Sequence, residues 1–158
     1  MSDASFKDGA TKPLNLAALD SDGLAVLSAL VQDSVFPISE MRLDPKARRF
    51  ALLLNRFRWE DQSADGPKPR EYERVQSVLA FDGVLNVASQ GIDRSDKDVV
   101  LSLLTISFEA TGEGAGNILL TLAGDGAIRL NVEMLDVLLK DVTRPYLAPS
   151  KRAPSHPE

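Results

Sequence analysis

The chain has 158 residues, of which 44% are hydrophobic and 26% are charged, and these proportions suit one soluble globular domain with its own core. Its 18 basic and 23 acidic residues give a formal charge of -5, which argues against nucleic-acid binding, because that function needs a concentrated positive surface. The absence of cysteine excludes disulfides, thiolate nucleophiles and thiolate metal sites.

The two ends of the chain differ in composition from its body. Residues 1–13 are polar and lack the apolar stretch of a signal peptide, so we expect a disordered lead-in to a cytoplasmic protein. Residues 144–158 are rich in proline and are expected to form a disordered tail. A single α+β domain is predicted over 14–143, and no apolar run is long enough to cross a bilayer.

The first predicted element is a helix over 21–34. Asp20 or Ser21 can cap its first turn, and apolar residues follow at helical spacing: Leu24, Leu27 and Val31. Pro37 prevents the helix from continuing. We expect the helix to cover the core, and the alternative is a surface for a partner or a second copy of the chain.

Seven strands and a second helix are predicted after this helix. The strands are recognised by apolar runs, several of them alternating with polar residues, and by the turn signals between them: Ile38–Leu43, Arg49–Trp59, Tyr72–Phe81, Val84–Gln90, Val99–Ala110, Ile118–Leu122 and Ile128–Val132. A mobile loop is expected over 60–71. Asp82-Gly83 and Gly124-Asp125-Gly126 predict hairpins. A final helix is predicted over 133–142.

The order of these elements suggests a fold class. Short connections between neighbouring strands imply an antiparallel meander. A bent seven-stranded sheet, or partly open barrel, with an N-terminal and a C-terminal helix resembles the pleckstrin-homology-like architecture, in which the last helix plugs one end of the barrel. The alternative is an α+β layer fold with two helices on one face of a curved sheet. Neither fold determines a function.

Three segments carry a resemblance to a known family: RRFALLLNRFRWE (48–60), SQGIDRSDKDVVLSLLTISFE (89–109) and GAIRLNVE (126–133). Together with the apolar helix, and in the same order, they resemble a family of uncharacterised bacterial proteins found mainly in alphaproteobacteria. The resemblance covers nearly the whole predicted domain. It implies a small cytoplasmic domain, and it carries no activity, ligand or site residue.

The densest polar segment is the loop over 91–98. Asp93, Asp96 and Asp98 offer oxygen ligands of the kind that Mg²⁺ and Ca²⁺ prefer, but their spacing does not match an EF-hand. Aspartate and serine side chains also cap turns. We therefore predict a capped turn without a metal, in which Asp93 or Ser95 bonds to local backbone amides and Arg94 pairs with a carboxylate. The alternative is a ligand or partner contact through Asp93, Arg94 and Asp96.

A second candidate is basic, because residues 42–58 hold six basic side chains and one acid. Arg56 and Arg58 would share one face of a strand, with Phe57 and Trp59 on the opposite face. We expect solvated arginines that pair with nearby acids. The alternative is a surface that includes Arg56, Arg58 and Trp59 and binds a phosphate-bearing ligand or an acidic protein.

The residues that most often perform catalysis are nearly absent. There is no cysteine, and the single histidine is His156 in the predicted tail, so the Ser-His-Asp and Cys-His mechanisms are closed. Catalysis by paired carboxylates, lysine or tyrosine stays open, although no motif supports it. We predict a non-enzymatic binding or scaffold domain without a cofactor, whose partner is another protein or a second copy. The alternative is a binder of, or an enzyme on, a small anionic or phosphate-bearing ligand held by Arg56, Arg58 and Arg94.

Overall fold

The computed structural model describes residues 13–58, 73–142 and 146–147. Within these residues the chain forms the α-helix α2 (Ser21–Leu30), the short 3-10 helix η1 (Ile38–Glu40) and an 11-stranded sheet. The strands are β1 (Asn15–Ala18), β2 (Ser34–Pro37), β3 (Met41–Asp44), β4 (Arg49–Phe57), β5 (Glu73–Asp82), β6 (Val84–Gln90), β7 (Val100–Gly112), β8 (Ala115–Leu122), β9 (Ala127–Val132), β10 (Val137–Asp141) and β11 (Tyr146–Leu147).

Three predicted features lie wholly or mostly outside the described residues. They are the lead-in over 1–13, of which only Pro13 is described, the loop over 60–71, and the tail over 144–158, of which only β11 is described. Trp59 also lies outside them. Among the described residues, no helix has the length and apolar character that a membrane span requires.

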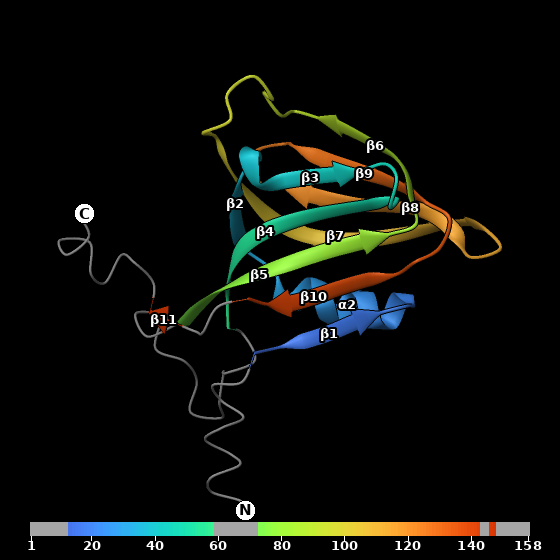
Figure 1. Cartoon of the computed structure of the whole chain (residues 1–158), viewed down its shortest axis with the longest axis horizontal. Helices are drawn as coiled ribbons and strands as arrows, with labels where there is room; N and C mark the ends of the chain where they lie inside the picture. The colour runs from blue at the N-terminus through green and yellow to red at the C-terminus, as the bar shows by residue number, and fades with distance from the viewer. Residues whose placement is uncertain (1–12, 59–72, 143–145, 148–158) are drawn as a thin grey trace, which may run out of the picture.

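The sheet folds over on itself into two layers. Its strand order is β1-β10-β5-β4-β2-β7-β8-β9-β6, while β3 pairs with β4 and β11 pairs with β5. Figure 1 shows β4, β5, β10 and β1 in one layer, with β7, β8 and β9 behind them. Strand β2 pairs with β4 on one side and with β7 on the other, so it joins the layers.

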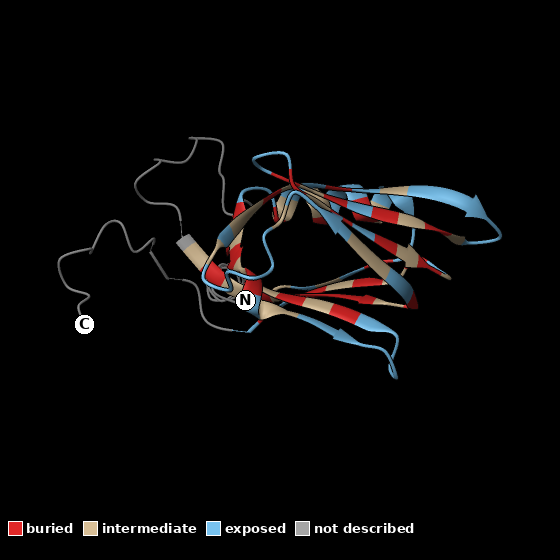
Figure 2. Cartoon of the chain, turned by 90° about the horizontal axis from the view of Figure 1, so that it is seen from above, coloured by how far each residue is buried: buried red, intermediate tan, exposed pale blue. Residues whose placement is uncertain are grey.

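The core lies between these layers. Figure 2 shows the two layers facing each other, with buried positions alternating along the strands. The alternation is clean on β8 and β9, where Ile118, Leu120, Leu130 and Val132 are fully buried. Each such side chain contributes about 1.5–3 kcal/mol when it is fully removed from water. The period of two that predicted these strands therefore reflects one face turned toward the core.

Helix α2 confirms the predicted N-terminal helix, although it ends at Leu30. Asp20 caps its first turn, because the Asp20 side chain accepts a hydrogen bond from Gly23 N at 2.8 Å. Leu24 and Leu27 are buried, and the helix packs against β1 and β7. The Ser28 hydroxyl also accepts a hydrogen bond from Ile106 N on β7 at 2.9 Å. The helix therefore bridges the two layers where β1 and β7 do not pair.

The predicted C-terminal helix is wrong. Residues 137–141 of the predicted helix instead form strand β10, which pairs with β1 on one side and with β5 on the other. Val137, Leu139 and Asp141 are buried, whereas Leu138 and Lys140 are less so, which is a period of two. A short apolar run fits a helix and a strand almost equally well, and pairing on both sides decides for the strand. Strand β1 was not predicted either, because it pairs with β10, which the sequence predicted to be helical and therefore unavailable as a strand partner.

The pleckstrin-homology-like arrangement is wrong as well. The sheet has 11 strands rather than seven, and within the described part of the chain no helix follows β9. All seven predicted strands are present as β3 to β9, with bounds that differ by a few residues. What differs is the pairing, because β6 pairs with β9 instead of β5.

The Asp82-Gly83 hairpin is the specific error behind that pairing. A type I′ turn needs positive φ at both central residues, but only Gly83 (φ 71°) meets this condition, and Asp82 does not. Gly83 O accepts a hydrogen bond from Glu133 N, and Val84 N donates one to Arg48 O, both at 2.9 Å. The chain therefore crosses at Gly83 from the layer of β5 to the layer of β6.

Candidate functional site

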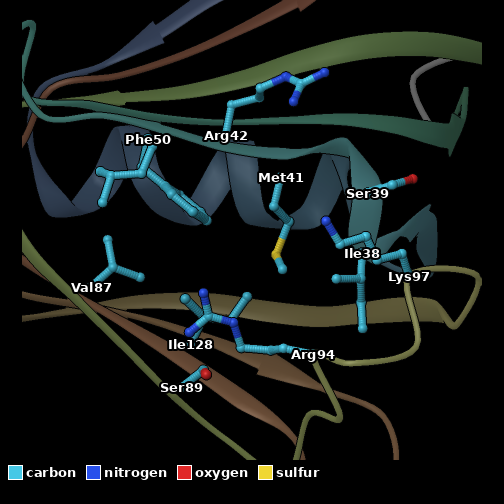
Figure 3. Close-up of a pocket in the computed structure, with 11 residues that line it drawn as sticks. Ile38, Ser39, Met41, Arg42, Phe50, Val87, Ser89, Arg94, Lys97 and Ile128 are labelled. Atoms are coloured by element: carbon cyan, nitrogen blue, oxygen red, sulfur yellow. The ribbon is translucent and has the colours of Figure 1, made fainter.

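A cavity of about 320 Å³ lies between the β3–β4 side of the sheet and the β6–β9 side. Its lining comes from η1, β3, β4, β6, β9 and the loop over 91–98, and the residues are Ile38, Ser39, Met41, Arg42, Leu43, Phe50, Val87, Ser89, Arg94, Lys97 and Ile128. Figure 3 shows most of these side chains turned toward a common space. The volume is at the lower end of that of small-molecule sites.

The floor of the cavity is apolar. Ile38, Phe50 and Ile128 are buried, and Met41 and Val87 are half-buried. Phe50 also packs against Phe81, with ring centroids 6.3 Å apart, and this contact restricts the position of the Phe50 ring. This floor suits the apolar part of a ligand.

The loop over 91–98 forms the charged rim, and its aspartates hold its shape. Asp93 Oδ1 accepts hydrogen bonds from the backbone N (3.0 Å) and the hydroxyl (2.5 Å) of Ser95. Asp96 Oδ1 accepts one from Asp98 N at 3.1 Å. The two bonds from Ser95 lower the pKa of the Asp93 carboxyl, with the side-chain bond as the larger cause. These contacts confirm the predicted cap by Asp93, whereas the predicted ion pair of Arg94 with a carboxylate is not formed among the described residues.

The ends of this loop are anchored to neighbouring strands. Gly91 has φ 70°, and a Cβ atom there would lie 2.8 Å from Asp125 O in the β8–β9 turn, so only glycine fits this approach without strain. At the other end, Ile38 N donates a hydrogen bond to Val99 O at 3.0 Å. The loop is thus held across the cavity between the β8–β9 turn and η1.

Arg94 and Lys97 are the two loop cations that face the cavity. Figure 3 shows both side chains extending over the lining, whereas Arg42 extends away from Arg94. Among the residues that the structure describes, no aspartate or glutamate lines the cavity, and none forms an ion pair with Arg94 or Lys97. Both side chains are exposed at the rim, and Asp93, Asp96 and Asp98 belong to the same loop. The cavity therefore meets two cationic hydrogen-bond donors without an ion pair, and not a net positive surface.

A metal site is not supported in the part of the chain that the structure describes. No group of three or more His, Cys, Asp or Glu side chains is arranged there to hold a metal ion. Asp93 and Asp96 instead direct their carboxylate oxygens at backbone amides of their own loop.

The predicted solvated face of arginines is wrong for Arg56 and Arg58. Both side chains point inward and are buried, with Arg56 at 0% and Arg58 at 3% exposure. Arg56 pairs with Asp141 at 3.0 Å, and Arg58 Nη1 lies 3.9 Å from the same carboxylate. Neither residue lines the cavity, so the structure does not bring Arg56 and Arg58 together with Arg94 there.

The remaining basic residues of 42–58 are dispersed. Arg48 pairs with Glu133 at 3.0 Å and Arg49 pairs with Asp82 at 2.7 Å, both on the surface. The bond from Asp82 raises the pKa of the Arg49 guanidinium. The basic residues of 42–58 therefore do not form one surface. Arg56 and Arg58 point into the core, Arg48 and Arg49 pair with separate acids, and Arg42 lies at the cavity rim.

Residues 14–156 match DUF2948, a family whose description is "Protein of unknown function". The chain belongs to this family. This match confirms the predicted resemblance to an uncharacterised family. The origin of the family in alphaproteobacteria and the cytoplasmic location of the protein stay predictions. No curated protein and no solved structure matches the chain.

Membership of DUF2948 assigns no site, so the cavity is defined by its geometry alone. Sequence reasoning singled out Arg94 but not Lys97. It did not identify Ile38, Met41 or Phe50 as lining residues. The one local signal was the loop itself, in which the capping aspartates leave the intervening Arg94 and Lys97 without a structural role.

Proposed function

We propose that this domain binds a small amphipathic anion in the cavity between β3 and β6. The observation that carries the proposal is an apolar floor beneath Arg94 and Lys97, two of the three lining cations (the third is Arg42), with no ion pair to these cations and no acid in the lining among the described residues. The anionic group of the ligand would contact Arg94, and its apolar part would contact Phe50 and Ile128. A guanidinium group suits this role because it donates two parallel hydrogen bonds to a carboxylate or phosphate.

Binding is proposed without turnover of the ligand. The polar groups of the lining besides the cations are the hydroxyls of Ser39 and Ser89. General acid–base catalysis requires a group of matched pKa within hydrogen-bond reach, and the described lining residues include no carboxylate or imidazole. Of the three arginines predicted to hold an anion (Arg56, Arg58 and Arg94), only Arg94 lines the cavity, so the proposed contact with the anionic group is through Arg94.

The test uses octanoate and octyl phosphate, with 1-octanol as a neutral control. A ligand that binds only the folded state at a hundred times its Kd stabilises the protein by about 2.7 kcal/mol, which corresponds to a rise in Tm of about 5–10 °C at a slope of roughly 2–4 °C per kcal/mol. We expect a rise with either anion, a smaller effect with 1-octanol, and loss of the difference in Arg94→Gln.

Two further variants keep this test decisive. Val87→Phe fills the cavity from β6 without removing a charge, and it should also abolish the response to both anions. Lys140→Gln removes an exposed cation on β10, outside the lining, and should respond like the unchanged protein. If neither anion raises the Tm of the unchanged protein, or if Arg94→Gln and Lys140→Gln respond equally, the proposal is wrong.

A protein partner is the second candidate, because β6 has an open edge. In the described sheet β6 pairs with β9 on one side only, and Leu85 on this strand is 53% exposed. An extended peptide can add to such an edge through backbone hydrogen bonds. Light scattering and pull-down with the unchanged chain and with Leu85→Lys test this candidate. A monomer without a specific partner, whatever the residue at 85, argues against it.

A further inference from the structure

We infer that the ligand carries two anionic groups, one at each end of an apolar segment. This inference rests on the proposed function and names the class of ligand more narrowly. It follows from how the loop over 91–98 distributes its two cations over the cavity.

Arg94 and Lys97 belong to two successive turns of the loop. In the first turn Asp96 N donates a hydrogen bond to Asp93 O at 3.4 Å, and in the second Val99 N donates one to Asp96 O at 3.3 Å. Arg94 therefore occupies the second position of the first turn, and Lys97 occupies the same position of the next turn. Because the backbone advances between them, the two side chains leave the loop at different points.

The two cationic groups consequently do not converge. Figure 3 shows the Arg94 guanidinium on the side of the cavity where Val87, Ser89 and Ile128 lie, and the Lys97 ammonium on the side of Ile38. The side chain of Met41 lies between them in this view. A single carboxylate or phosphate at Arg94 thus leaves Lys97 without an anionic partner.

The material between the cations is apolar. Ile38 is 7% exposed and Met41 is half-buried, and neither offers a hydrogen bond from its side chain. A polar ligand segment there would lose its hydration without compensation, whereas methylene groups gain from contact with this surface. The combination fits an α,ω-dianion such as an alkanedioate, with one carboxylate at Arg94 and the other at Lys97.

The experiment measures Kd by calorimetry for octanoate and octanedioate, with hexanedioate and decanedioate added to find the preferred spacing. A second charge-assisted hydrogen bond is expected to make octanedioate, or the best of the series, bind about tenfold more tightly than octanoate. Lys97→Gln should lower the affinity for the dianion to that for octanoate and leave octanoate unchanged. Arg94→Gln should weaken both ligands.

The control variant is again Lys140→Gln, which should change no Kd. Equal affinities for octanoate and the best alkanedioate, or equal effects of Lys97→Gln on both, would overturn the dianion inference while the proposed function stands. If octanoate, octyl phosphate and every alkanedioate fail to bind, both are overturned. A circular dichroism spectrum of each variant excludes misfolding as the cause of a lost response.

Discussion

Arg56 on β4 and Asp141 on β10 form a buried ion pair across the intervening strand β5. Arg56 donates to Asp141 from Nε (3.1 Å) and Nη2 (3.0 and 3.1 Å), and both side chains have an exposure of 0%. Ser77 on β5 lies between them, donating to Asp141 Oδ1 at 2.7 Å and accepting from Arg56 Nε at 3.1 Å. Leu14 N, beside β1, donates to Asp141 Oδ2 at 2.7 Å. One carboxylate thus links four neighbouring parts of the sheet.

Asp141→Asn should therefore be strongly destabilising. Removing one member of a buried ion pair typically costs about 3–5 kcal/mol, because the remaining charge stays in a poorly solvated environment. Urea denaturation followed by circular dichroism measures the free energy of unfolding. Asp125→Asn makes the same chemical change at an exposed turn residue and should change stability by less than about 0.5 kcal/mol. A loss of unfolding free energy in Asp141→Asn that is as small as the loss in Asp125→Asn would show that the ion pair contributes little to stability.

Asp20→Ala should destabilise the domain by about 1 kcal/mol, the usual cost of losing an N-cap. The Asp20 side chain accepts from Gly23 N at 2.8 Å, and the helix that it caps joins β1 to β7. Asp20→Ser retains an oxygen acceptor and should keep most of the stability. The midpoint of chemical denaturation compares the three proteins. A loss of equal size in the serine variant would contradict the capping role.

Gly91→Ala and Gly124→Ala separate the effect of positive φ from that of close approach. The two glycines have φ of 70° and 79°, so alanine at either should cost about 1–2 kcal/mol from its backbone conformation. At Gly124 no described residue lies within 4 Å of an added Cβ atom, whereas at Gly91 Asp125 O lies 2.8 Å from it. Gly91→Ala should thus be the more destabilising variant, and it should also weaken anion binding by moving the loop. Equal denaturation midpoints would show that the loop accommodates the methyl group.

The Asp93 carboxyl should titrate at a lower pH than an unperturbed aspartate. Its hydrogen bonds from Ser95 lower its pKa in the folded state, so they contribute stability above the unfolded pKa of about 3.9, and this contribution is lost as the pH falls through the folded pKa. Carboxyl NMR titration measures the value directly. Ser95→Ala removes the larger cause and should raise the pKa of Asp93 toward its ordinary value. An unchanged pKa in that variant would assign the shift to another group.

The sequence by itself located most of the strands and turns. Alternation of apolar residues placed β4 to β9 within a few residues, because a strand with one buried face has a period of two that needs no knowledge of its partner. The β8–β9 hairpin was also predicted, and Gly124 and Asp125 both have positive φ there. The cap by Asp93 in the loop over 91–98 was also predicted, because its hydrogen bond reaches only two residues along the chain. The equivalent cap by Asp96 was found in the structure.

Only the tertiary structure decided which strands pair and what the loop cations face. Residues 137–141 became β10 because β1 and β5 lie on either side, and Arg56 turned inward because Asp141, 85 residues away, receives it. The cavity likewise gathers side chains from positions 38 to 128. Hydrogen bonds within a few residues are specified locally, whereas pairing and burial depend on partners that only the folded chain brings within reach.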